Sequence, residues 1–274
     1  MKGLMLGLAC TMVAVLGAQA PASPQPQIST PAAPGAGRGT PQPLPDLTCA
    51  DLSAALRAVA ANDARLRDWP QMNRYRTSND SVKSAQVVFM GDSITDFWQQ
   101  PRFGGFFPGK AYADRGISGQ TTPQMLVRFR PDVLNLKPKA VVILAGTNDI
   151  AGNTGAMTDE EIEGNLASMS ELAHAHQVKV ILSSITPVSD YHLATPTGNP
   201  QTSQRPMSRI RAINEWMKRY AADHGDVYLD YFSAMVDERG VLKTDLSADD
   251  LHPTAAGYAV MTPLAEAAIQ RALR

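Results

Sequence analysis

The sequence predicts an α/β fold, a three-layer α/β/α sandwich built on a five-stranded parallel sheet. Five short apolar runs alternate with longer segments whose apolar residues recur at helical spacing, the order that βαβ units produce. Three of these runs are followed directly by glycine and small polar residues, which is typical of the carboxyl ends of strands where ligands bind. Right-handed crossovers then place helices on both faces of the sheet.

The expected elements begin at residue 87 and alternate to the end of the chain. Strands are expected at 87–90, 111–114, 140–145, 178–185 and 227–229, and helices at 122–129, 158–176, 207–224 and 253–273. Thr158 followed three residues later by Glu161 predicts a capping box at the start of its helix. The run 140–145 is apolar at every position, as expected of a strand that helices cover on both faces.

The first 46 residues carry no pattern of a folded domain. Residues 1–20 combine a lysine at position 2, an apolar run and the ending Ala18-Gln19-Ala20, which predicts a secretory signal peptide too short to span a membrane. Residues 21–46 are rich in proline and alanine and contain no aromatic residue, which predicts a disordered linker. We therefore expect a secreted or periplasmic protein with no stable membrane span after signal removal, or an anchored one if the signal is not cleaved.

The folded domain is expected over 47–274, with a helical extension at 51–75. Apolar residues of the helix 51–67 recur on one side, so we expect it to pack on the outside of the main domain, anchored by Trp69 and Tyr75.

Overall composition excludes some partners. The 274 residues have a formal net charge of −1 with acidic and basic residues interspersed, so nucleic acid is not an expected partner. Two cysteines cannot form a disulfide framework, and Cys10 is expected to leave with the signal peptide. Cys49 is then expected to be a buried structural cysteine.

A candidate nucleophile, Ser93, follows the first apolar run within Gly91-Asp92-Ser93. The turn places Ser93 at a strand's carboxyl end and a helix's start, where unpaired N–H groups favour an oxyanion. The alternative interpretation is a serine that only caps the helix.

Two further motifs follow the second and third strands. Gly116-Ile117-Ser118-Gly119 has glycines that allow a tight loop with a backbone N–H directed at a ligand, and Asn148 lies in Gly146-Thr147-Asn148-Asp149. An ordinary strand-to-helix turn and an asparagine that caps a turn remain the alternatives.

The fourth motif, Asp249-Asp250-Leu251-His252, directly precedes the last helix. On one turn of helix, residues three apart are neighbours, so Asp249 reaches the His252 ring while Asp250 points elsewhere. An acceptor on one ring nitrogen leaves the other free to take a proton from a hydroxyl. With Ser93, this predicts a nucleophile, a base and an orienting carboxylate.

With these four motifs the sequence resembles the SGNH or GDSL hydrolases, in particular secreted bacterial GDSL-type esterases and lipases related to lysophospholipases, over the whole chain after the linker. The resemblance implies the flavodoxin-like form of the sandwich and a serine esterase without cofactor or metal. It implies that Ser93 attacks an ester, His252 takes its proton and Asp249 holds His252. The oxyanion hole would consist of the Ser93 and Gly119 N–H groups and the Asn148 side chain. Ile94 stands where the family name has leucine, an apolar supporting position.

The resemblance leaves the substrate open. A short or soluble acyl ester is expected, as a small molecule or as an ester of a glycan or lipid, with lysophospholipase or thioesterase activity as alternatives. Acyl transfer to an acceptor other than water also remains possible. The oligomeric state is not predicted.

Two functions of other classes compete. One is a non-catalytic binding module. The other is a metal-dependent phosphoesterase with ligands from Asp92, Asp96, Asn148, Asp149 and His252, although the chain has only five histidines. His174 and His176 do not add a metal pair, because residues two apart on a helix point to different faces.

Several aromatic residues near the candidate site have an open role. They are Phe97, Trp98, Phe103, Phe106 and Phe107, which fit a substrate pocket or the core equally well. Tyr191 and His192 are expected in a mobile rim.

Overall fold

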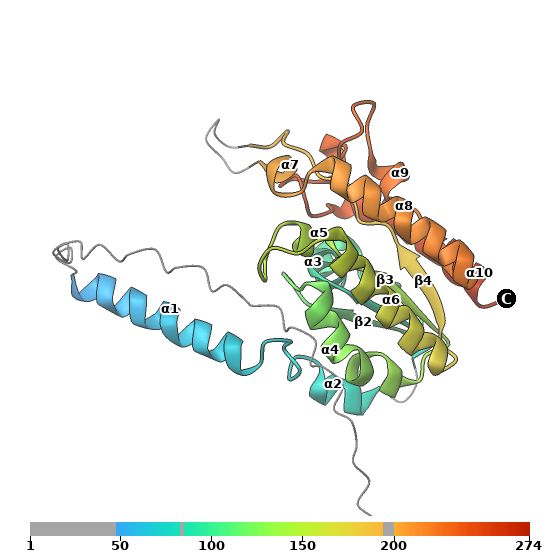
Figure 1. Ribbon diagram of the computed structural model, residues 1–274, viewed down its shortest axis with the longest axis horizontal. Coiled ribbons are helices and arrows are strands. Elements are labelled where there is room, and N and C mark those ends of the chain that lie inside the picture. The colour runs from blue at the N-terminus through green and yellow to red at the C-terminus, as the bar shows by residue number, and fades with distance from the viewer. Residues whose placement is uncertain (1–47, 83–84, 194–199) are drawn as a thin grey trace, which may run out of the picture. The chain divides into compact units, whose positions relative to one another are not determined.

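The computed structural model describes residues 48–82, 85–193 and 200–274, so the expected signal peptide and linker lie outside the described residues (Figure 1). Residues 50–274 form one compact unit around a five-stranded sheet whose strands all run parallel, in the order β2-β1-β3-β4-β5. The strands are β1 (Val87–Gly91), β2 (Tyr112–Gly116), β3 (Ala140–Leu144), β4 (Lys179–Ser183) and β5 (Val227–Leu229). The predicted sheet is confirmed.

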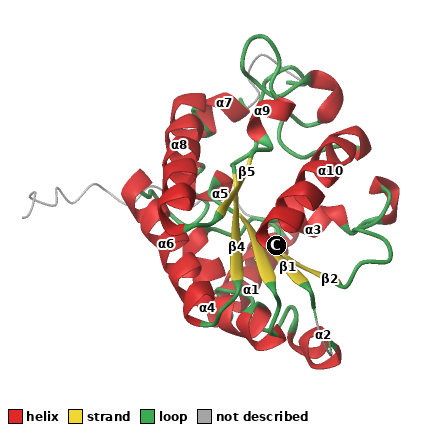
Figure 2. Ribbon diagram, turned by 90° about the vertical axis from the view of Figure 1, so that its right-hand side faces the viewer, coloured by secondary structure: helices red, strands yellow, loops and turns green. Residues whose placement is uncertain are grey.

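Helices cover both faces of this sheet, which completes the three layers. Figure 2 shows α4 (Thr122–Asp132), α6 (Asp159–Ala175) and α8 (Met207–His224) on one side, and α3 (Ser93–Trp98) and α10 (Ala255–Ala272) on the other. Shorter elements and the N-terminal helices complete the described chain: α1 (Cys49–Arg67), α2 (Arg76–Ser81), α5 (Thr147–Ile150), α7 (Gln201–Gln204), α9 (Phe232–Met235) and 3-10 turns at Pro101–Phe103, Leu134–Leu136 and Thr244–Leu246.

Successive side chains along each strand point to opposite faces of the sheet and so contribute to two separate hydrophobic cores. Val88 and Met90 of β1 point into the core beneath α4, α6 and α8, whereas Val87 and Phe89 point into the core beneath α3 and α10. Because both faces are covered, every residue of β1 is buried. This is why the strands appear in the sequence as continuous apolar runs.

The central position of β1 determines where the site lies. Gly91 at the end of β1 is in register with Gly116 of β2 on one side and with Leu144 of β3 on the other. The chain leaves β1 for β2 and then crosses to β3 on the opposite side, a topological switch point at which ligands bind in open α/β sheets. The motifs that follow β1, β2 and β3 therefore begin at the same edge.

Local signals predicted most helix boundaries. The capping box of α6 is present, with the Glu161 N–H donating to Thr158 Oγ1 at 3.2 Å and the Thr158 N–H donating to Glu161 Oε2 at 2.8 Å. Helix α4 runs three residues further than expected: although Pro131 lies in its last turn, Val133 N still donates to Phe129 O at 2.9 Å.

The N-terminal extension differs from the expectation. Helix α1 forms, but the expected packing of its apolar side chains is wrong: Leu56 and Val59 are each 65% exposed and Leu66 is 77% exposed. Cys49, at the start of this helix, is exposed and not buried. The alanine-rich segment is helical by intrinsic propensity, which requires no packing partner. Within the described ranges, no helix combines the length and hydropathy needed to cross a bilayer.

Of the two expected anchors, Tyr75 is confirmed, because it is buried and its hydroxyl donates to Gly116 O at the end of β2. The expected anchoring by Trp69 is wrong as far as burial goes, because Trp69 is 38% exposed. The glycine at position 116 is required, since a Cβ there would lie 2.1 Å from the Asp96 nitrogen of α3.

Candidate active site

Ser93 is the first residue of α3 and lies directly beyond the end of β1. The helix cap is Asp92, whose Oδ1 accepts the Ile94 N–H at 2.9 Å. The interpretation of Ser93 as the capping residue is therefore wrong. Ile94 is 1% exposed, which confirms its role as an apolar support.

The structure brings the three predicted catalytic side chains together. His252 Nε2 lies 2.9 Å from Ser93 Oγ, and His252 Nδ1 lies 2.6 Å from Asp249 Oδ2. A carboxylate only accepts hydrogen bonds, so it selects the ring form with a proton on Nδ1. Nε2 is then the nitrogen that accepts the Ser93 hydroxyl.

The segment from Asp249 to His252 is a turn, not the turn of helix that was expected. Asp249 still reaches the ring of His252, three residues on, because its Oδ1 accepts the backbone N–H of His252 at 2.7 Å and of Leu251 at 3.2 Å. These bonds fold the chain back on the carboxylate. Burial raises the pKa of Asp249, but hydrogen bonds from the His252 side chain and backbone outweigh it and hold that pKa well below its usual range. The carboxylate is thus ionised at neutral pH.

Asp250 holds this turn in place, a role that the sequence analysis did not identify. It has a left-handed backbone with φ of 67°, and its side chain points away from His252, as expected. Its carboxylate accepts hydrogen bonds from the Ser189 hydroxyl at 2.6 Å and from the His192 N–H at 2.7 Å. Tyr191 N also donates to it, at 3.0 Å, so Tyr191 and His192 are tied to the turn and do not form a loose rim.

Gly119 and Asn148, the candidate oxyanion residues from separate motifs, are connected through the side chain of Asn153. Asn153 Nδ2 donates to Gly119 O and to Asn148 Oδ1, both at 3.1 Å, and Asn148 Nδ2 donates to Gln120 O at 3.0 Å. Gly119 has a φ of 79°, a conformation that favours glycine. Asn153 was not singled out from the sequence, because only folding brings it beside both motifs.

A fully buried arginine joins the nucleophile turn to the Gly119 loop. Arg128 of α4 donates from Nη2 to Gly91 O at 3.1 Å, from Nε to Gln120 Oε1 and from Nη1 to Asp132 Oδ2 at 3.1 Å. Burial lowers the pKa of Arg128, and the adjacent Asp132 opposes this change. The ion pair with Asp132 thus holds the Arg128 cation where the Ser93 turn and the Gly119 loop meet.

Acidic residues that a metal-dependent phosphoesterase would use as ligands form hydrogen bonds with different partners. Asp149 Oδ1 accepts the Thr122 N–H at 2.8 Å and its hydroxyl at 2.6 Å, and Asp96 Oδ2 accepts the Ser118 hydroxyl at 2.7 Å. Asp92 and Asp149 thus accept hydrogen bonds within the fold. Among the described residues, no three His, Cys, Asp or Glu side chains are grouped as for a metal ion.

Most of the aromatic residues after Ser93 belong to the core. Trp98 and Phe107 are buried at 2% and 4% exposure. Phe97 borders the site, with its ring centroid 5.0 Å from that of His252.

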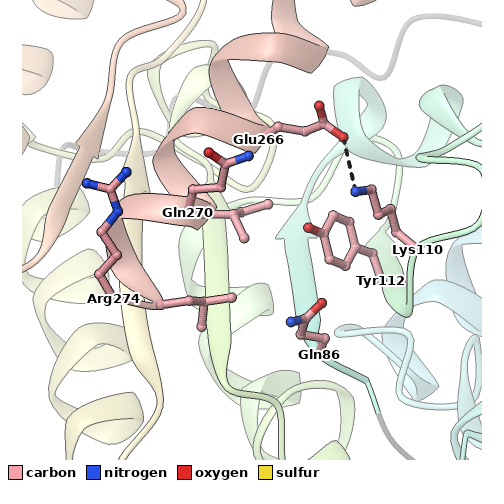
Figure 3. A pocket seen from close by; sticks show the side chains of 8 residues that line it. Gln86, Lys110, Tyr112, Glu266, Gln270 and Arg274 are labelled. Carbon is pink, nitrogen blue, oxygen red and sulfur yellow. Dashed lines mark ion pairs between the residues drawn. The ribbon is translucent and has the colours of Figure 1, made fainter.

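A hollow of about 410 Å³ lies at the opposite end of the strands. Gln86 precedes β1 and Tyr112 begins β2, and both line it together with residues near the end of α10. Figure 3 shows Lys110 and Glu266 facing each other across it, with Lys110 Nζ 3.8 Å from Glu266 Oε1. This hollow is therefore separate from the Ser93 site.

Comparison with known proteins identifies the family. Residues 89–260, well over half of the chain, match the GDSL-like lipase/acylhydrolase family. The chain belongs to this family.

Relatives of the GDSL-like family resemble nearly the whole folded part. A structure from Bacteroides fragilis described as an acylhydrolase is 40% identical and covers 75% of this chain and 99% of its own, with a TM-score of 0.68. A structure of a GDSL-like lipase from Bacteroides thetaiotaomicron is 40% identical, covers 74% of this chain and 99% of its own, and has a TM-score of 0.66. Platelet-activating factor acetylhydrolase IB subunit alpha2 of Rattus norvegicus is 28% identical over 80% of this chain and 92% of its own. The protein is thus an acylhydrolase-type enzyme that acts on ester bonds.

Proposed function

We propose that the protein hydrolyses short or soluble carboxylic esters with Ser93 as nucleophile, His252 as general base and Asp249 as the carboxylate that orients it. The observation that carries the proposal is the continuous contact from Ser93 Oγ to His252 Nε2 at 2.9 Å and from His252 Nδ1 to Asp249 Oδ2 at 2.6 Å. Nucleophile, base and orienting group at hydrogen-bonding distance are the arrangement that activates a serine hydroxyl.

In the proposed reaction, Ser93 Oγ attacks the ester carbonyl as His252 Nε2 takes its proton. The tetrahedral intermediate collapses when His252 returns the proton to the leaving alcohol, which gives an acyl-serine. Water, deprotonated by His252, then attacks the acyl-serine, and the proton returns to Ser93 as the acid leaves. Asp249 remains ionised throughout and stabilises the imidazolium that forms at each step.

The negative oxygen of each intermediate is stabilised by the backbone N–H groups of Ser93 and Gly119 and by the Asn148 side chain. The hydrogen bonds of Asn153 to Gly119 O and Asn148 Oδ1 support this assignment, because they hold both groups in place before the charge develops. Such preorganised donors stabilise a transition state most effectively where water is excluded.

A short acyl group is favoured over a long one. The rat relative named above is an acetylhydrolase, which supports an acetyl or similar ester as substrate here. We also propose that the protein is exported, because residues 1–20 have the pattern of a signal peptide.

The test is hydrolysis of p-nitrophenyl esters from acetate to decanoate by wild type and Ser93→Ala, with EDTA present throughout. We expect turnover by wild type and a fall in kcat of about 10⁴-fold or more in the variant. The matched control is Ser168→Ala, since in the described part of the chain that hydroxyl donates to Gly164 O of its own helix and to no other residue, and it should retain full activity.

The alternatives give different outcomes. Equal activity in Ser93→Ala and wild type would show that another group is the nucleophile. Loss of wild-type activity in EDTA would favour metal-dependent chemistry, and an optimum at decanoate would favour a lipase or lysophospholipase over a short-chain esterase.

A further inference from the structure

A pocket of about 630 Å³ opens beside the proposed oxyanion hole, and its lining includes Gly119 and Asn153. Its volume lies within the range of about 300–1,000 Å³ typical of small-molecule sites. A ligand in this pocket therefore adjoins Gly119, and it adjoins Asn153, which hydrogen-bonds to Asn148.

The far wall of the pocket is a segment of the N-terminal extension that two buried glutamines hold in place. Gln124 Nε2 donates to Trp69 O at 2.7 Å, and Gln120 Nε2 donates to Pro70 O at 2.7 Å. Gln120 and Gln124 are 1% and 7% exposed. These bonds connect the backbone of residues 69–70 to the Gly119 loop through Gln120 and to the first turn of α4 through Gln124.

Trp69 is held by its backbone, yet the residue is 38% exposed and lines this pocket. Burial among apolar neighbours therefore does not account for its position. A fixed, open indole beside a catalytic centre offers a flat apolar surface to part of a ligand.

The rest of the lining is mainly polar. Gln71, Ser118, Asn153 and Thr154 contribute amides and hydroxyls, and all four residues are exposed to solvent. Asp68 adds a carboxylate, and Leu66 is the one apolar side chain beside Trp69 among the described lining residues. A saccharide ring matches this combination, because its C–H face packs on the negative face of an aromatic ring while its hydroxyls exchange hydrogen bonds with side chains. An aliphatic chain would remove these polar groups from water without replacing their hydrogen bonds, which costs free energy.

We propose that this pocket, with Trp69 as its stacking surface, binds the sugar ring of an O-acylated saccharide whose ester lies at Ser93. This inference rests on the proposed function, since it names the substrate class of the same site. Trp69 is then a residue that determines specificity and takes no part in bond breaking.

The experiment compares two kinds of acetate ester in wild type, Trp69→Ala and Trp69→Phe. The sugar substrates are the monoacetylated methyl glycosides of glucose, galactose and xylose, and the reference substrate is ethyl acetate, which has no ring. We expect wild type to prefer at least one sugar ester, and Trp69→Ala to lower its kcat/KM by about tenfold, mainly through KM, while ethyl acetate hydrolysis stays within about twofold. Trp69→Phe, which keeps an aromatic face, should restore much of the preference.

Val127→Ala is the matched control, because Val127 is also an exposed apolar side chain, at 51% exposure, but lies outside the pocket lining. It should leave both substrates unaffected. Thermal unfolding of all variants shows whether the fold is retained.

Other outcomes overturn the inference. A wild type without preference for any sugar ester, or a Trp69→Ala variant that loses both substrates equally, would do so. Selective loss of p-nitrophenyl decanoate hydrolysis in Trp69→Ala would assign the pocket to an apolar acyl chain instead. Each of these leaves the proposed function standing as long as Ser93→Ala abolishes ethyl acetate hydrolysis, whereas persistence of that activity refutes the proposed function itself.

Discussion

Replacing Asp92 by asparagine is expected to stabilise the protein at neutral pH, even though Asp92 is next to Ser93, the proposed nucleophile. Its side chain is 0% exposed. One oxygen accepts the Ile94 N–H, but Asp92 Oδ2 has no hydrogen-bond partner among the described residues. Burial raises the pKa of Asp92 from 3.8 to about 6, while the Ile94 hydrogen bond and the nearby His252 oppose part of this rise.

The size and sign of the effect follow from that pKa. A rise of about 2 units corresponds to about 3 kcal/mol, at about 1.4 kcal/mol per unit. Below the unfolded pKa of 3.8, Asp92 is protonated in both the folded and the unfolded state, so its burial does not lower the free energy of unfolding through ionisation. As the pH rises from 3.8 to about 6, the unfolded chain ionises while Asp92 in the folded state stays protonated, so the free energy of unfolding falls. The whole loss of about 3 kcal/mol is present at neutral pH.

The assay is urea unfolding of wild type and Asp92→Asn across the range from about pH 4 to about pH 8. Asparagine keeps an oxygen for the Ile94 N–H but does not ionise. The free energy of unfolding of the variant relative to wild type should therefore increase with pH by up to about 3 kcal/mol. Ser168→Ala, which changes no ionisable group, should show a difference independent of pH. A flat difference for Asp92→Asn as well would refute the reasoning.

Two further predictions concern the supports of the site. Arg128→Met should lower the free energy of unfolding by about 3–5 kcal/mol, because it leaves the buried Asp132 without its cation, and chemical denaturation measures this; an effect below about 1 kcal/mol would contradict a structural ion pair. Asn148→Ala should lower kcat for p-nitrophenyl acetate by about 10²–10³-fold with little change in KM, as steady-state kinetics will show, and an unchanged kcat would remove Asn148 from the oxyanion hole.

Much of the fold was predictable because the signals are local. Apolar runs, helical periodicity and the Thr158 capping box depend on residues close in sequence, and all three were identified correctly. The motifs that follow β1, β2 and β3 were predictable as neighbours because the carboxyl ends of parallel strands meet at one edge. The exposed side chains of α1 were not predictable, since an apolar stripe indicates which side of a helix seeks burial but not whether another surface covers it.

The sequence by itself determined the order of strands and helices, the family and the identity of Ser93, Asp249 and His252 as the candidate catalytic residues. Tertiary structure alone decided how these residues are supported. The Asp250 carboxylate holds the turn through Ser189, which is 61 residues away, and Gln124 holds Trp69 across 55 residues. Contacts at such separations leave no periodic pattern in the chain, because they depend on the three-dimensional packing of whole elements.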